Sequence, residues 1–137
     1  MANALYSKYK EACLTGSPAI SLTLDTIKCV LVDTGSYTVN LATDQYLSDI
    51  AGGARTATSS ALSSKSATLG VFDAADITFT AVSGAVSEAL VLYKDTGSAA
   101  TSPLIAYIDT ATGLPVTPAG TDIAVAWSNG SSKIFAL

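Results

Sequence analysis

Asp76-Ile-Thr-Phe-Thr-Ala-Val82 and Glu88-Ala-Leu-Val-Leu-Tyr-Lys94 are the two segments that decide the fold. In the first, Ile77, Phe79 and Ala81 alternate with polar residues, which is the pattern of a strand with one face in water. The second is apolar on both faces and is bounded by turn residues, so it predicts a strand that is covered on both sides. We expect this second strand to lie at the centre of the molecule.

Short runs of similar character continue on both sides of this pair. Leu104–Ile108 is again apolar, and Ile27–Asp33 and Asp122–Ser128 are further expected strands. Asn129-Gly130 predicts a tight hairpin that returns the chain along Lys133–Leu137. About eight or nine short strands separated by turn signals favour a mainly β fold, namely an antiparallel β-sandwich or barrel.

Two short helices are expected beside these strands. Over residues 2–14, Leu5, Tyr9 and Cys13 recur every four residues and would form one apolar helix face that packs on the body. Thr43 is the expected N-cap of the second helix. No linker interrupts the chain, so we expect one domain over residues 1–137, with the helix at about 2–14 and a β body at about 20–137.

The expected core consists of the inward positions of these strands, and Ala54–Leu62, which alternates small and polar residues, is an expected edge strand. The core residues are Val30, Val32, Phe72, Ile77, Phe79, Val91, Tyr93, Ile105, Tyr107, Val125, Trp127 and Phe135.

The composition excludes several classes of function. Lys and Arg total 7 against 11 Asp and Glu, so the chain lacks the clustered cations that nucleic-acid binding needs. There is no His, which removes the commonest general base and the commonest zinc ligand. Hydrophobic residues make up 49% and charged residues only 13%, which favours a surface partly covered by other protein. No apolar run is long enough to span a membrane, and a membrane is not expected among the partners.

The two cysteines, Cys13 and Cys29, lie among apolar neighbours, and both are expected to be small buried side chains. Two cysteines do not make a disulfide framework, and the spacing of a metal site is missing. No cofactor is expected.

Asp33-Thr-Gly35 follows an apolar strand, and in this it resembles the active-site segment of aspartic proteases. A second copy stands at Asp95-Thr-Gly97, and two carboxylates held close together could share a proton and activate water. The alternative is that Asp-Thr-Gly is turn chemistry, because Asp caps a turn with its side chain and Gly accepts positive φ. Asp-Thr also occurs at Asp25 and Asp109, again after apolar runs, which favours the turn interpretation and leaves an enzyme using Asp33 as a remote alternative.

Asp73 and Asp76, with Asp109 if it lies near, could hold Ca²⁺ in a loop. The regular twelve-residue calcium-loop pattern is missing, and carboxylates in a turn are commonly solvated caps. Trp127 could belong to a sugar-binding platform, but it alternates with apolar residues and is expected in the core.

One ordered set of segments runs through nearly all of the chain. These segments are Ala4–Glu11, Ile27–Thr34, Leu47–Ile50, Gly70-Val-Phe-Asp-Ala-Ala-Asp-Ile-Thr-Phe79, Leu104–Val116 and Ala126–Phe135. Taken together in this order, they resemble a family of small virion structural proteins of tailed bacteriophages.

This resemblance implies a non-enzymatic component of the virion that is made in the host cytoplasm, namely a capsid decoration (cement) protein, with no catalytic residues to carry over. A tail or baseplate component, or an adhesin, of the same virion is the alternative. The expected partners are copies of the chain itself, arranged as a trimer, and the major capsid protein or other virion proteins. Ala54–Leu62 and the helix over residues 2–14 are the expected contact elements.

Overall fold

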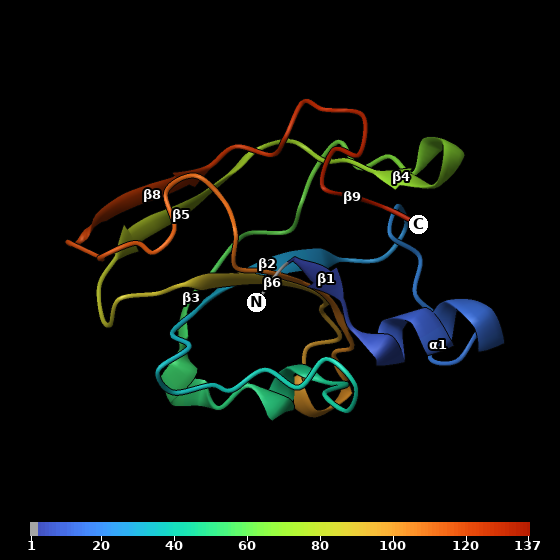
Figure 1. Ribbon diagram of the computed structural model, residues 1–137, viewed down its shortest axis with the longest axis horizontal. Helices are drawn as coiled ribbons and strands as arrows, with labels where there is room; N and C mark the ends of the chain where they lie inside the picture. Colours follow the sequence, from blue (N-terminus) through green and yellow to red (C-terminus); the bar gives the residue numbers. More distant parts are fainter. Residues whose placement is uncertain (1–2) are drawn as a thin grey trace.

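The computed structural model describes residues 3–137, and its centre is a five-stranded antiparallel sheet (Figure 1). The strands lie in the order β1-β7-β6-β2-β3, which places β6 in the middle. β6 is buried along its whole length except at Lys94, as its apolar sequence predicts. The bounds are Ala4–Leu5 for β1, Ile27–Val32 for β2, Arg55–Thr58 for β3, Ala89–Lys94 for β6 and Leu104–Ile108 for β7.

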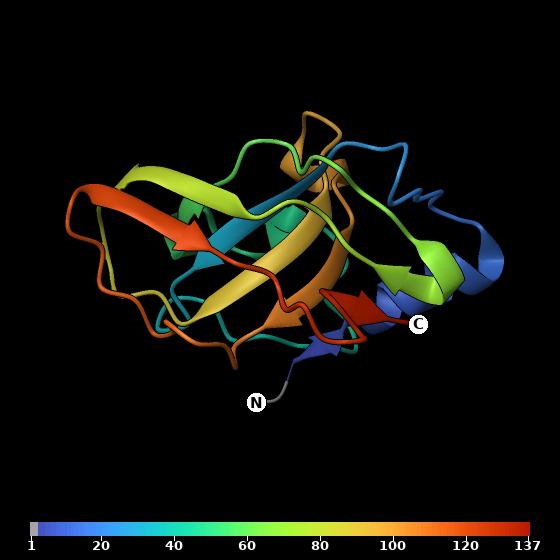
Figure 2. The ribbon, with the colours of Figure 1, turned by 90° about the horizontal axis from the view of Figure 1, so that it is seen from above.

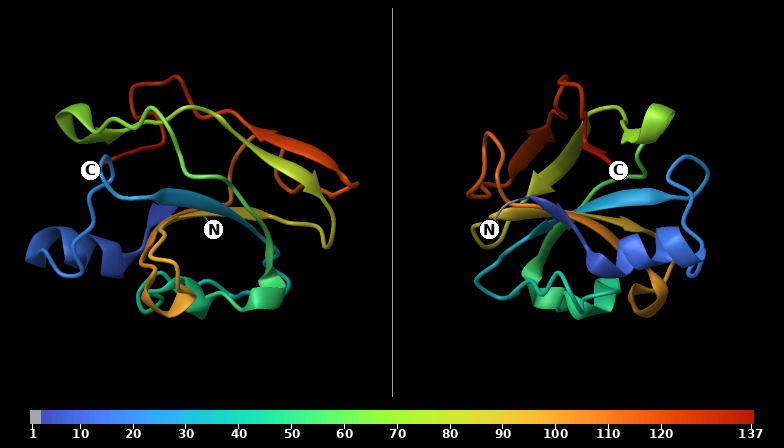
Figure 3. Two further views of the ribbon diagram at one scale, coloured as in Figure 1. Left: turned by 180° about the vertical axis from the view of Figure 1, so that it is seen from behind. Right: turned by 45° about the vertical axis from the view of Figure 1, so that its right-hand side comes forward.

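Two short ribbons cover one face of this sheet, as Figures 1 and 3 show. In the first ribbon, β5 (Ile77–Val82) pairs with β8 (Thr121–Val125). In the second, β4 (Val71–Phe72) pairs with β9 (Phe135–Ala136). The ring centroids of Phe72 and Phe135 lie 5.4 Å apart between the two strands of this second ribbon.

The opposite face is covered by irregular chain and by 3-10 helices (Figure 3). These are η1 (Leu47–Asp49), η2 (Gly52–Ala54) and η4 (Ala99–Thr101), whereas η3 (Thr68–Gly70) lies on the ribbon side, directly before β4. The sheet is therefore a middle layer, and this explains why β2, β6 and β7 are apolar on both faces. The expected mainly β, antiparallel fold is confirmed. Within residues 3–137 the sheet does not close into a barrel, because β1 and β3 are its two edges.

The N-terminal helix α1 is shorter than expected and begins later, at Ser7–Thr15. Leu5 lies in β1 and not in the helix, and Ala2 lies outside the described residues. The helix buries Tyr9 and Ala12, while Cys13 faces solvent, so the prediction that Cys13 packs inward was wrong. The helix stops where expected, since Gly16 has φ 76° and its N–H donates to the carbonyl of Ala12.

The strand β5 departs from strict alternation. Its register against β8 shifts between Phe79 and Val82, which marks a β-bulge. Ala81 adopts φ 49° inside the bulge and is exposed, and Val82 takes the buried position that the alternation assigned to Ala81. The prediction for Ala81 was therefore wrong, because period-2 counting fails across an inserted residue.

The expected hairpin at Asn129-Gly130 is also absent from the part of the chain that the structure describes. β9 pairs with β4 and not with β8, and the Asn129-Gly130 turn belongs to a longer connection. In this arrangement the ring of Phe135 packs on Phe72 and lies edge-on to Tyr9, with ring centroids 6.2 Å apart in the second pair. Burial of this ring between α1 and β4 outweighs the local turn preference.

The expected second helix is a single 3-10 turn, η1, and Thr43 is not its N-cap. The Asp44 carboxylate accepts hydrogen bonds from the Asn40 N–H and the Tyr37 hydroxyl, so the polar groups of this segment form turns and not a helix start.

Most of the predicted core is confirmed. Nine of the twelve predicted residues are buried, and Ile77, Val125 and Phe135 are half-buried against them.

Candidate functional site

The Asp33-Thr-Gly35 segment is a closed turn. One carboxylate oxygen of Asp33 accepts the N–H of Gly35 at 2.8 Å, and the other accepts the Ser36 hydroxyl at 3.1 Å. The N–H and hydroxyl of Thr34 both donate to Glu88, at the start of the central strand. The Asp33 carboxylate therefore fastens the turn after β2, as the turn interpretation predicts.

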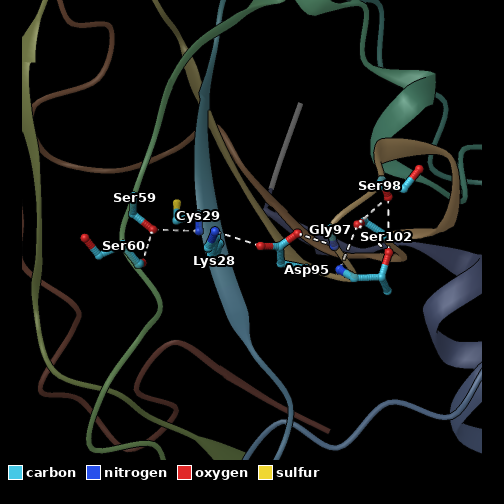
Figure 4. Close-up of polar contacts among 9 residues, drawn as sticks. Lys28, Cys29, Ser59, Ser60, Asp95, Gly97, Ser98 and Ser102 are labelled. Atoms are coloured by element: carbon cyan, nitrogen blue, oxygen red, sulfur yellow. Dashed lines mark hydrogen bonds and ion pairs between the residues drawn. The ribbon is translucent and has the colours of Figure 1, made fainter.

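The Asp95-Thr-Gly97 segment is built in the same way (Figure 4). One oxygen of Asp95 accepts the N–H of Gly97 at 3.0 Å, and the other forms an ion pair with Lys28 at 2.7 Å. The Lys28 ion pair and, after it, the Gly97 N–H hold the pKa of the Asp95 carboxyl below its usual range. Figure 4 shows the Asp95 side chain between Lys28 of β2 and its own turn, and both of its oxygens take part in these local contacts.

The two Asp-Thr-Gly segments lie at opposite ends of β2. Asp33 directly follows the last residue of that strand, whereas the N–H of Asp95 donates to Thr26, directly before the first. Six residues of strand separate them, which is about 20 Å at a rise of about 3.3 Å per residue. Carboxylates at this distance do not share a proton, so one chain does not form the paired site of an aspartic protease.

The candidate calcium ligands are engaged in separate local contacts. Asp73 accepts the N–H of Ala74, and Asp76 accepts the N–H of Trp127, which joins β5 to the chain after β8. Asp109 lies at the end of β7, where its N–H donates to Asn3. No group of three or more acidic, Cys or His side chains converges on one point within residues 3–137. Trp127 is 8% exposed, which confirms its place in the core and argues against a sugar platform.

The two cysteines are in different environments. Cys29 is completely buried in β2, and burial raises the pKa of its thiol. Its backbone N–H donates to the Ser59 hydroxyl, as Figure 4 shows. Cys13 is exposed on α1. The two thiols therefore do not act together.

The edge of the sheet at β3 is open. Pairing with β2 continues past the strand, because the N–H groups of Ser59 and Leu62 donate to the carbonyls of Cys29 and Ile27. On its other side β3 has no strand partner among residues 3–137. The segment expected as an edge strand at Ala54–Leu62 is thus confirmed as an edge, but the strand is shorter than expected: β3 covers only Arg55–Thr58, Ala54 belongs to η2, and residues 59–62 lie outside any strand.

Exposed leucines gather at one end of the molecule. Leu14, Leu24 and Leu69 are 88%, 88% and 96% exposed, and Leu137 is 68% exposed. The segments that carry them are the last turn of α1, the chain between α1 and β2, η3, and the residue directly after β9. Figures 1 and 2 show these segments together at the same end, on the right in both views. We call these four side chains the leucine end.

Sequence reasoning did not single out the leucine end. Leu14 and Leu69 stand beside turn residues, in Leu14-Thr-Gly16 and Thr68-Leu-Gly70, and Leu24 ends the weak alternation of Ile20–Leu24 directly before Asp25-Thr26. A large apolar residue inside a turn segment, where no face of an element could bury it, was the available signal.

No protein-family model matches this chain, and no curated protein matches it. Within residues 3–137, no helix is long and apolar enough to cross a membrane.

Proposed function

We propose that this protein is a structural subunit of a tailed-bacteriophage particle, and that it acts by associating with copies of itself and with the shell. In the most direct form of the proposal it is a head decoration protein, assembled as a trimer. Each copy would bridge neighbouring shell subunits. It would stabilise the particle by mass action, because it binds the assembled lattice and not the free subunit.

The observation that carries the proposal is the leucine end. Single exposed leucines are common on protein surfaces, but four at the same end of the molecule favour a surface that protein contacts cover. The sequence has few charged groups to hydrate the remaining surface, since only 13% of residues are charged. The ordered resemblance to small virion proteins supports the same conclusion.

The occupant of the leucine end is taken to be a second copy of this chain. Leu14 lies on α1, one of the two elements that the sequence suggested as contacts. The other, the open edge at β3, offers unpaired backbone groups to a strand of a neighbour. In a ring with closed symmetry, each copy can use both the leucine end and the β3 edge to contact its neighbours. A specific contact would remove at least about 1,000 Å² of accessible surface from water.

Light scattering on the purified chain tests the association. Replacing Leu14, Leu24 and Leu69 together with Gln should convert a trimer into monomers without changing the circular dichroism spectrum. Val86→Gln is the matched control. Val86 is also an exposed apolar side chain, at 42%, but it lies on the connection from β5 to β6, at the opposite end of the molecule in Figure 1. A monomeric parent chain, or equal effects of both variants, would remove the leucine end as the contact.

Particle imaging separates the head from the tail. Labelled protein added to emptied phage heads should bind over the whole shell if it decorates the capsid. Label at one vertex alone would support the tail or baseplate alternative, and absence of label from the entire particle would end the virion proposal.

A further inference from the structure

A cavity of about 450 Å³ opens between the central sheet and β8. Its floor is one row of side chains across three neighbouring strands. Leu31 of β2 pairs with Leu90 of β6, which pairs with Ile108 of β7, so the three point to the same face. Figure 3 shows β8 above this face of the sheet.

The walls are also aliphatic. Ile123 and Val125 of β8 lie on one side, Val116 comes from the loop after β7, and Ile134 comes from the chain before β9. These four residues are only half-buried, although they belong to strands or packed loops. Protein interiors are normally filled to the density of organic crystals, so partial exposure of so many aliphatic side chains marks an unfilled space. Its volume is within the usual range of small-molecule sites, about 300–1,000 Å³.

Lys133 is the one charged residue among those that line the cavity. It is half-buried and forms no ion pair with residues 3–137. The neighbouring polar group of Asn3 is already occupied, because its side chain bonds to the backbone of Asp109 and Thr110. A ligand would therefore meet a long aliphatic surface and one available cation.

We infer that this cavity binds a small amphipathic anion, of which a medium-chain alkyl carboxylate is the simplest example. The alkyl chain lies along the row of Leu31, Leu90 and Ile108, and the carboxylate lies at Lys133. Burial of the chain supplies the affinity, and the cation sets the preference for an acid over a neutral molecule. This inference is independent of the leucine end and of any attachment to a particle.

Trp127 makes the test direct, because it is the only Trp in the chain and it lines the cavity. Decanoate titrated into the protein, below its micelle concentration, should change the Trp127 emission saturably. Hexanoate should bind at least about tenfold more weakly, since each methylene that leaves water contributes severalfold. Decanol is the uncharged comparison. In Lys133→Gln, the affinity for decanoate should fall by about two- to fivefold while the affinity for decanol is unchanged. This is the size of effect expected from one partly exposed ion pair.

Val125→Phe should abolish binding, because the larger ring enters the cavity. Val39→Phe is the matched control. Val39 is also half-buried against the core, but it does not line the cavity. If Val125→Phe loses its native circular dichroism spectrum, the test uses Val116→Phe instead, which fills the same space from a loop. Failure of decanoate and decanol to bind the parent chain would overturn the inference, as would undiminished binding in a folded cavity-filled variant.

Discussion

The hydroxyl oxygens of Tyr6 and Tyr37 lie 3.0 Å apart in the layer beneath the central sheet. The Tyr37 hydroxyl also donates to the Asp44 carboxylate at 2.7 Å, so the three side chains form one hydrogen-bonded chain. Tyr6 is completely buried, and its backbone N–H donates to Ile105 of β7. Burial raises the pKa of both tyrosine hydroxyls. This chain of contacts fastens the irregular segment before η1 to the sheet.

Tyr37→Phe should destabilise the protein more than Tyr6→Phe. The first change removes both hydrogen bonds and leaves the buried Tyr6 hydroxyl without a partner, which should cost about 2–4 kcal/mol. The second removes one bond and leaves the Tyr37–Asp44 contact intact, which should cost about 1 kcal/mol. Urea unfolding of the two variants gives the comparison, and equal losses would show that the chain of contacts does not act as a unit.

Acid should weaken the fold through two carboxylates at one end of the sheet. The Ser21 N–H and then Lys94 lower the pKa of Asp25, and the Lys28 ion pair lowers that of Asp95. A pKa that is lower in the folded state gives stability that is fully present above the unfolded value, about 3.9, and is lost as the pH falls through the folded value.

Free energies of unfolding measured at pH 7 and below pH 4 should therefore differ less in Asp95→Asn than in the parent chain. Glu11→Gln is the control, since this side chain is 59% exposed on α1. If the free energy of unfolding falls equally in the parent chain and in Asp95→Asn when the pH is lowered, this ion pair does not have the proposed role.

One thiol should react in the folded protein and two in the unfolded protein. Cys13 is exposed, whereas Cys29 is completely buried and burial raises the pKa of its thiol, which suppresses the reactive thiolate. A thiol reagent such as dithionitrobenzoate, added with and without denaturant, counts the reactive groups. Cys13→Ser should eliminate the fast reaction, and a persistent fast phase in that variant would show that β2 opens.

Burial on both faces was predictable where the sequence is locally unambiguous. Glu88–Lys94 has no polar face, and a strand without a polar face must be covered on both sides, as β6 is. The turn role of Asp33 was predictable for a similar reason, because Asx turns are made by residues two or three apart. Such signals need no knowledge of distant contacts.

Features decided by tertiary packing were not predictable. Asn129-Gly130 is a strong hairpin signal, yet β9 does not pair with β8, because the ring of Phe135 packs on Phe72 and Tyr9. The bulge at Ala81 depends on a long-range bond from its N–H to the carboxylate of Asp122, 41 residues away. The cavity over Leu90 depends on how four strands and two loops converge, so no local pattern predicts it.

The last prediction concerns the β5 residue that anchors the β5–β8 ribbon to the sheet. Phe79 is 1% exposed on one side of the bulge, and its removal should cost about 3–5 kcal/mol in Phe79→Ala. Thr78 is the adjacent exposed residue of the same strand, and Thr78→Ala should change stability by less than about 0.5 kcal/mol. Both values follow from denaturant unfolding of matched samples. A loss below about 1 kcal/mol in Phe79→Ala would mean that the β5–β8 ribbon is not packed on the sheet through this ring.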